Sequence, residues 1–157
     1  MKKPGHKALR IGRYSCPGQT YLVTFATKDR NPLFIDPAVA GDAVECMLES
    51  SAWESSTLLH WVLMPDHWHG LIALGEHIPL SPCVARLKGG SARGLRLLYS
   101  DIEAVWASGF HDRALRTEEG MAAAADYIEA NPVRAGLVRE IADYPFVGSV
   151  WAKRKQA

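Results

Sequence analysis

The sequence predicts an α+β fold with the ferredoxin-like order β-α-β-β-α-β, in which an antiparallel sheet carries helices on one face and one further helix follows at the C-terminal end. Short stretches rich in β-branched and aromatic residues alternate with amphipathic stretches that begin with helix-capping residues. Two of the β-rich stretches are separated only by a Pro-Asp turn. No internal repeat or linker divides the 157 residues, so we expect a single domain.

The expected strands are residues 20–27, 57–64, 67–74 and, with a weaker pattern, 105–110. The first stretch, TYLVTFAT, has the β-branched and aromatic content that favours a strand. The second and third, TLLHWVLM and HWHGLIAL, are interrupted only at positions 65–66. Two strands joined by so short a break are expected to pair as a hairpin.

Two helices are expected on the connections between these strands. A loop over residues 28–34 leads to Asp36, which can cap a helix whose first turn holds Pro37. The second helix opens at Ser81 and has apolar residues at helical spacing. Three glycines weaken this second helix by about 1 kcal/mol each.

The C-terminal helix is expected to begin at Thr117, a capping residue followed by two glutamates that suit the helix dipole. It runs through alanine-rich sequence to about Asn131. Pro132 then ends the helix or restarts a turn, because the residue before a proline avoids the α conformation. Gly136 closes the segment.

The composition is that of an ordinary soluble domain, with 48% hydrophobic and 22% charged residues. No apolar run approaches the roughly 18 residues of a membrane helix, and the basic N-terminus lacks the apolar stretch of a signal peptide. The three cysteines, Cys16, Cys46 and Cys83, are scattered, which argues against a disulfide framework and against a CxxC zinc site. We expect a cytoplasmic protein with no membrane partner.

Charge is unevenly distributed although the net charge is only +1. Residues 1–28 contain no acidic residue, residues 31–85 contain no lysine or arginine, and residues 86–96 are basic again. We therefore expect a single domain over residues 1–157 with a basic N-terminal arm at 1–16 and a basic tail at 148–157. A polyanion could bind the basic segments, although solvated surface patches give the same pattern. The candidate contacts are Arg10, Arg13, Arg86, Lys88, Arg93 and Arg96.

His67 and His69 are separated by one residue on an expected strand. Residues i and i+2 of a strand point to the same face, so both imidazoles can meet one metal ion while Trp68 faces the core. The motif alone is a weak signal, because two such histidines also occur as ordinary surface residues. Two ligands leave a metal shell incomplete, so a third protein ligand or a substrate oxygen is needed.

Tyr127 and Asn131 lie four residues apart and so share one face of the C-terminal helix. A tyrosine hydroxyl with an ordinary pKa near 10 is a poor nucleophile unless it is activated. A cation that polarises a phosphate makes such a nucleophile sufficient. The residues alone also allow Tyr127 to be a packing residue against its small neighbours.

Four blocks of the sequence resemble the REP-associated tyrosine transposases, which are related to the single-tyrosine insertion-sequence transposases of the HUH class. Each block alone is modest evidence, but all four occur in the family's order and spacing. The blocks are PGQTYLVTFATKDRNPLF at residues 17–34, VLMPDHWHGLIAL at 62–74, VWASGFHDRALR at 105–116 and DYIEANPVRAGLV at 126–138.

The resemblance implies a bacterial, metal-dependent DNA nickase or strand transferase that acts on single-stranded DNA hairpins through a 5′-phosphotyrosine intermediate. It implies that Tyr127 is the nucleophile and that His67 and His69 bind Mg²⁺ or Mn²⁺. Asn131 stands where relatives often place a glutamine as a third polar ligand. Gly70 replaces a larger apolar residue of many relatives, which is expected to affect packing. The resemblance is compatible with a monomer or a homodimer.

Two other functions remain open at this point. A hairpin-binding protein without turnover would have the same fold, since ferredoxin-like sheets also serve as nucleic-acid-binding platforms. A metal-dependent hydrolase would use water as the nucleophile and leave Tyr127 with a structural role. A covalent protein–DNA adduct distinguishes the transposase from the hydrolase, and binding without cleavage identifies the binding protein.

Overall fold

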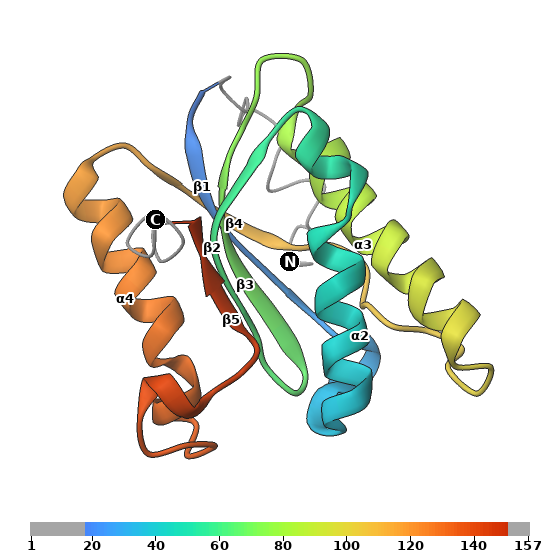
Figure 1. Cartoon of the computed structure of the whole chain (residues 1–157). Helices are drawn as coiled ribbons and strands as arrows, with labels where there is room; N and C mark the ends of the chain where they lie inside the picture. Colours follow the sequence, from blue (N-terminus) through green and yellow to red (C-terminus); the bar gives the residue numbers. More distant parts are fainter. Residues whose placement is uncertain (1–17, 151–157) are drawn as a thin grey trace, which may run out of the picture.

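The computed structural model describes residues 18–150, whose arrangement is shown in Figure 1. Within these residues five strands form one sheet in the order β4-β1-β3-β2-β5, and all neighbouring pairs are antiparallel. The strands are β1 (Thr20–Ala26), β2 (Thr57–Leu63), β3 (His67–Ala73), β4 (His111–Leu115) and β5 (Val147–Ser149).

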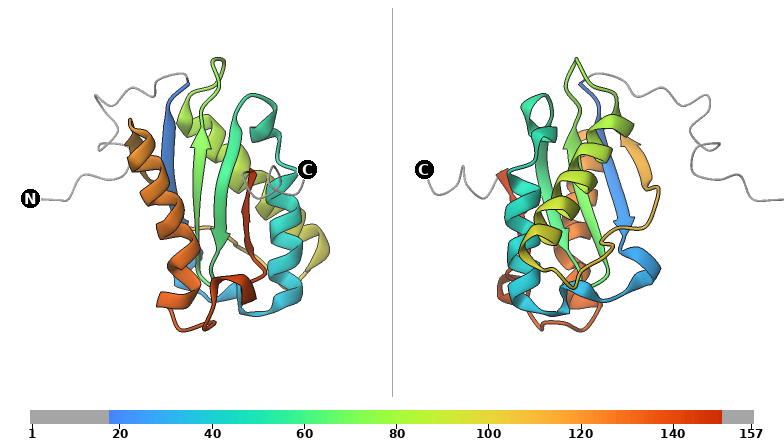
Figure 2. Two further views of the ribbon diagram at one scale, coloured as in Figure 1. Left: turned by 60° about the vertical axis from the view of Figure 1, so that its left-hand side comes forward. Right: turned by 90° about the vertical axis from the view of Figure 1, so that its right-hand side faces the viewer.

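Three α-helices cover the two faces of the sheet within the described residues. They are α2 (Pro37–Leu48), α3 (Leu80–Leu98) and α4 (Glu118–Arg134). Helices α2 and α3 lie together on one face and α4 lies on the other, as both views of Figure 2 show. Because α2 joins β1 to β2 and α3 joins β3 to β4, the predicted β-α-β-β-α-β fold is confirmed. No helix in the described part of the chain is long and apolar enough to cross a membrane.

Each face of the sheet buries its own hydrophobic core. On the α2–α3 side, Trp68 is 1% exposed and stacks on Phe25 with ring centroids 4.9 Å apart. A Cβ atom on Gly70 would overlap the Trp68 indole, so glycine at this position makes room for the large ring. On the α4 side, Leu71 of β3 packs with Ile128 of α4, and both are fully buried. Alternate residues of β3 therefore serve two cores, which fixes the register of the strand.

The predicted hairpin is confirmed, and it places the start of β3 at one end of the sheet. Its turn is closed by a hydrogen bond of 2.8 Å from the Met64 N–H to the His67 carbonyl. His67 pairs with Ala26 at the last position of β1. Two predicted helix caps are also confirmed, since Asp36 accepts from Ala38 N and Thr117 accepts from Gly120 N. Helix α3 instead starts at Leu80 without a side-chain cap.

The weaker predicted strand at residues 105–110 is wrong. These residues form no ladder, and only Trp106 makes an isolated bridge with Thr27. Their apolar side chains pack into the core instead. The Trp106 ring, for example, packs edge-on against Phe25 with ring centroids 4.7 Å apart. The fourth strand is β4, which follows Gly109 with its φ of 82°. Strand β4 is a half-exposed edge strand of sequence HDRAL, so it lacks the hydrophobic pattern that would have indicated it.

Helix α4 continues beyond the predicted end near Asn131 and includes Pro132 in its last turn. The helix ends at Arg134, and Gly136 closes the segment as expected, since its φ of 75° allows a Schellman motif. In this motif the Leu137 N–H donates to the Pro132 carbonyl at 2.9 Å, and Gly136 N–H donates to the Val133 carbonyl at 3.0 Å. The longer helix adds Arg134 to the element that carries the predicted nucleophile.

Candidate active site

The two histidines of β3 face α4, on the side of the sheet opposite Trp68. The ring centroids of His67 and His69 lie 4.8 Å apart. The side chain of His67 is 17% exposed, whereas His69 is 6% exposed. The predicted convergence of the two rings is confirmed, because alternate residues of the strand share a face.

Each histidine uses its Nδ1 atom for a hydrogen bond with a neighbouring side chain. His69 Nδ1 lies 2.7 Å from the Thr24 hydroxyl, and His67 Nδ1 lies 2.7 Å from Asp66 Oδ1. Partners of this kind orient metal-binding histidines and leave Nε2 as the ligand atom. The donor set therefore fits a divalent cation held by two Nε2 atoms.

The electrostatics of His69 favour its neutral form. Burial lowers the pKa of His69 to about 3, with further contributions from the charges of His67, Arg134 and Arg30. A neutral imidazole is the form that binds metal ions, so His69 needs no deprotonation at physiological pH.

Tyr127 lies directly beside the histidine pair. Its ring centroid is 5.5 Å from that of His69, with the rings nearly perpendicular, and the residue is 41% exposed. Helix α4 and strand β3 thus bring the predicted nucleophile next to the predicted metal ligands.

Asn131 is positioned on the same side of α4 but is only 9% exposed. Its Nδ2 donates to the Tyr127 carbonyl at 3.0 Å, so the amide nitrogen is engaged within the helix. Only the amide oxygen of Asn131 is left to serve as a ligand. Within residues 18–150, the two histidines belong to no group of three or more His, Cys, Asp or Glu residues able to hold a metal.

Two arginines that the sequence did not single out flank this site. The guanidinium carbon of Arg134 lies 4.2 Å from the centroid of the Tyr127 ring. Arg30 Nε lies 3.3 Å from Asp66 Oδ2, on the other side of the histidine pair. Arg134 follows Tyr127 by seven positions on a helix, a spacing that could have indicated a shared face. No local signal could have linked Arg30 to Asp66.

The family of the chain follows from comparison with known proteins. Residues 16–131 match the family model described as Transposase IS200 like. The chain belongs to the IS200-like transposase family. No curated protein matches this transposase.

Two solved structures share the fold of the transposase. One is described as a REP-associated tyrosine transposase bound to a REP hairpin; its TM-score is 0.68 at 21% identity, covering 94% of this chain and 82% of that chain. The other is a putative transposase from Deinococcus radiodurans R1, with a TM-score of 0.56 at 22% identity, covering 82% of this chain and 96% of that chain.

The predicted DNA contacts of the transposase can be located in the structure only on α3. Arg10 and Arg13 lie outside the described residues. Helix α3, which carries the other predicted contacts, lies on the opposite face of the sheet from α4. Lys88 is half-buried, and its Nζ donates to the carbonyls of Ala107 and Gly109 at 2.6 and 2.7 Å, so its contact with DNA stays a prediction. The exposed cations of α3 are Arg86, Arg93 and Arg96.

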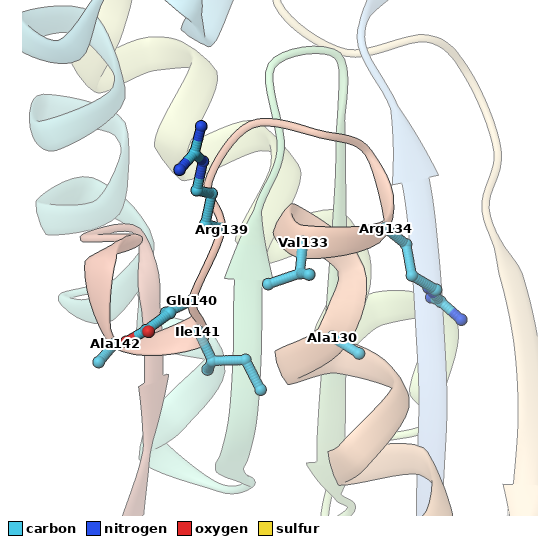
Figure 3. A pocket seen from close by; sticks show the side chains of 7 residues that line it. All are labelled: Ala130, Val133, Arg134, Arg139, Glu140, Ile141 and Ala142. Atoms are coloured by element: carbon cyan, nitrogen blue, oxygen red, sulfur yellow. The ribbon is translucent and has the colours of Figure 1, made fainter.

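A pocket adjoins the C-terminal end of α4, as Figure 3 shows. Helix α4 supplies one wall and the segment after it supplies the other. The side chain of Arg134 extends from the helix on the side away from Arg139 and Glu140. The lining residues are Ala130, Val133, Arg134, Arg139, Glu140, Ile141 and Ala142.

Proposed function

We propose that this transposase is a metal-dependent nickase and strand transferase that acts on single-stranded DNA hairpins through a 5′-phosphotyrosine intermediate. The observation that carries the proposal is the contact between His69 of β3 and Tyr127 of α4, with ring centroids 5.5 Å apart. A nucleophile beside two histidines with available Nε2 atoms is the arrangement that phosphoryl transfer by a tyrosine needs.

In the proposed reaction the Tyr127 hydroxyl oxygen attacks the phosphorus of a DNA linkage. The new bond joins tyrosine to the 5′-phosphate, the bond from phosphorus to the 3′-oxygen breaks, and the released 3′-oxygen gains a proton. Rejoining reverses these steps with a 3′-hydroxyl as the nucleophile, so no nucleotide cofactor is consumed. In this reaction Arg134, which lies against the Tyr127 ring, holds the orientation of that ring.

His67 and His69 would hold Mg²⁺ or Mn²⁺, with the Asn131 amide oxygen as a proposed further ligand. When bound, such a cation polarises the phosphate and neutralises charge that develops on it. Oxygen atoms from water or DNA would complete a mixed nitrogen and oxygen shell, which suits these two metals. Thr24 and Asp66 fix the orientation of the two imidazoles.

A hairpin substrate is supported by the structural neighbour that was solved with a REP hairpin and whose fold covers 94% of this chain. The transposase also displays cations on both sides of its sheet, with Arg30 and Arg134 at the site and three arginines on α3. DNA phosphates are the polyanion that such a distribution suits.

DNA binding by the transposase is expected to be sensitive to salt. Each phosphate contact contributes about 0.9 to the slope of log affinity against log salt. Replacing the three exposed arginines of α3 together (Arg86→Ala, Arg93→Ala, Arg96→Ala) should reduce that slope by about 2 to 3. Filter binding of a hairpin from low to physiological salt measures this slope, and the single substitution Arg116→Ala serves as a control. An unchanged slope in the triple variant would show that α3 carries only solvated charge.

The orienting partner of His69 is expected to control metal affinity. Thr24→Val keeps the shape and strand propensity of the side chain but removes the hydroxyl that meets His69 Nδ1. The Mn²⁺ concentration for half-maximal cleavage should rise about 10- to 100-fold, with a near-normal rate at saturating Mn²⁺. The control is Thr57→Val, at the exposed start of β2. Equal Mn²⁺ requirements for both variants would refute this role.

A further inference from the structure

A continuous row of side-chain contacts crosses the candidate active site and has an arginine at each end. At one end Arg30 Nε is 3.3 Å from Asp66 Oδ2, and at the other Arg134 lies 4.2 Å from the Tyr127 ring centroid. Asp66 in turn contacts the histidine pair, which contacts Tyr127. The row runs, in order, through Arg30, Asp66, His67, His69, Tyr127 and Arg134.

The loop that carries Arg30 is fixed to the hairpin turn at the start of β3. Thr27 is 1% exposed, and its N–H and hydroxyl both donate to the Asp66 carbonyl, at 2.9 and 3.1 Å. Asp29 and Arg30 both adopt the left-handed conformation, with φ of 55° and 56°. Two successive residues other than glycine in this region are uncommon, and such strain gathers at functional sites.

Arg134 is held at the opposite end of the row by helix α4. One of its terminal nitrogens donates to the Tyr127 carbonyl at 3.4 Å, and its guanidinium carbon lies over the Tyr127 ring, 4.2 Å from the centroid. Both arginines are exposed, and the Arg30 side chain is 61% exposed. A guanidinium has five N–H donors, so each of these single contacts leaves donors that can bind an anion. The charges of both arginines also reach His69.

We propose that Arg30 and Arg134 are substrate-binding residues that hold the cleaved strand by its phosphates, with Arg134 at the scissile phosphate beside Tyr127 and Arg30 at the adjacent phosphate on the His67 side. This assignment rests on the proposed cleavage by Tyr127. Two fixed, charge-assisted contacts on either side of the nucleophile would align the linkage for attack. A surface ion pair with Asp66 would by itself give Arg30 little importance, because exposed pairs contribute little.

The test combines arginine variants with substrates that carry one neutral linkage. The cleaved linkage is first mapped with wild-type protein and Mn²⁺. Binding is then measured in EDTA with Tyr127→Phe protein, which keeps the ring, so that neither cleavage nor a metal contact contributes. A methylphosphonate at the scissile linkage should weaken binding about tenfold, as expected for the loss of one charge-assisted hydrogen bond. In Tyr127→Phe/Arg134→Ala protein the same replacement should change binding less than about twofold.

In Arg30→Ala protein, a methylphosphonate at the adjacent linkage should no longer weaken binding. A methylphosphonate at the scissile linkage should still weaken it fully. The control is Arg116→Ala, which follows Leu115 at the Thr20 end of β1, whereas His67 pairs with Ala26 at the other end. Arg116→Ala should respond fully at both linkages. Thermal unfolding of each variant checks that the exposed substitutions leave the fold intact.

The outcomes separate this assignment from the proposed function. If the wild-type protein cleaves but the arginine variants keep the full methylphosphonate response, the phosphate-binding role of the arginines is overturned. The proposed function would then still stand. A higher Mn²⁺ requirement of Arg30→Ala without a change in that response would show that Arg30 only orients Asp66, and would also overturn it. Absence of cleavage and adduct with the wild-type protein would overturn the proposed function and this assignment together.

Discussion

The variant Tyr127→Phe is expected to lose DNA cleavage and the covalent adduct, with a fall in cleavage rate of about 10⁴-fold or more. The substitution removes the only atom of this side chain that can attack phosphorus. Because Tyr127 is 41% exposed and a phenyl ring preserves its contacts with His69 and Arg134, stability should change by less than about 0.5 kcal/mol. Hairpin affinity should be unchanged.

A matched control is Tyr99→Phe, which removes a hydroxyl that bonds Asp42 of α2, in the helix layer on the other face of the sheet. Tyr99→Phe should cleave at the wild-type rate. Cleavage rates come from a denaturing gel with a labelled hairpin and Mn²⁺. If Tyr127→Phe cuts at the rate of Tyr99→Phe, a mechanism with water as the nucleophile becomes the better account.

The second large effect is expected on removal of the metal or of a metal ligand. EDTA or His67→Ala should reduce cleavage by about 10³-fold or more, because the phosphate then lacks its polarising cation. His69→Gln should act similarly and avoids the cavity that alanine would leave at a position only 6% exposed. Added Mn²⁺ should restore activity after EDTA treatment but not in the His67→Ala variant.

The control for these variants is His77→Ala, which replaces an exposed histidine in the segment between β3 and α3. It should cleave normally and show the wild-type Mn²⁺ requirement. Isothermal titration with Mn²⁺ provides a readout that does not depend on turnover. Mn²⁺ binding should be lost in His67→Ala and kept in His77→Ala. Full cleavage in EDTA would exclude the proposed metal role.

The parts of the fold that could be predicted have strong local patterns. The β3 strand reads HWHGLIA, and its alternation places His67 and His69 on one face and Trp68 on the other without knowledge of any partner. The position of β4 could not be predicted in this way. Its half-exposed HDRAL carries no hydrophobic pattern, whereas the preceding apolar segment with Trp106 fills the core without forming a ladder.

The candidate site was predictable only where its residues lie on regular elements. His67, His69 and Tyr127 meet as expected because a strand and a helix each fix their direction. Arg30 depends on tertiary contacts between a loop and a distant turn, which leave no periodic signal. Lys88 was predicted as a DNA contact, and no pattern in the sequence indicated that its ammonium group donates to carbonyls of the irregular segment before β4.

The length of α4 could not be predicted because Pro132 is usually read as a helix end. Helix α4 nevertheless includes Pro132, whose carbonyl accepts from Leu137 N in the Schellman motif that follows the helix. The extra turn brings Arg134 against Tyr127 and therefore changes the chemistry expected at the site. Asn131 remains a predicted ligand, now restricted to its amide oxygen.

The most direct test of cleavage by Tyr127 is to identify the covalent product. A hairpin with single-stranded flanks, labelled differently at its 5′ and 3′ ends, is incubated with wild-type protein and Mn²⁺ and separated under denaturing conditions. Attack by Tyr127 should give a protein–DNA adduct that carries the 3′ label, a free fragment that ends in a 3′-hydroxyl, and a DNA-linked peptide in which Tyr127 is the modified residue. Cleavage that yields two free DNA fragments and no adduct, or an adduct at another residue, would contradict it.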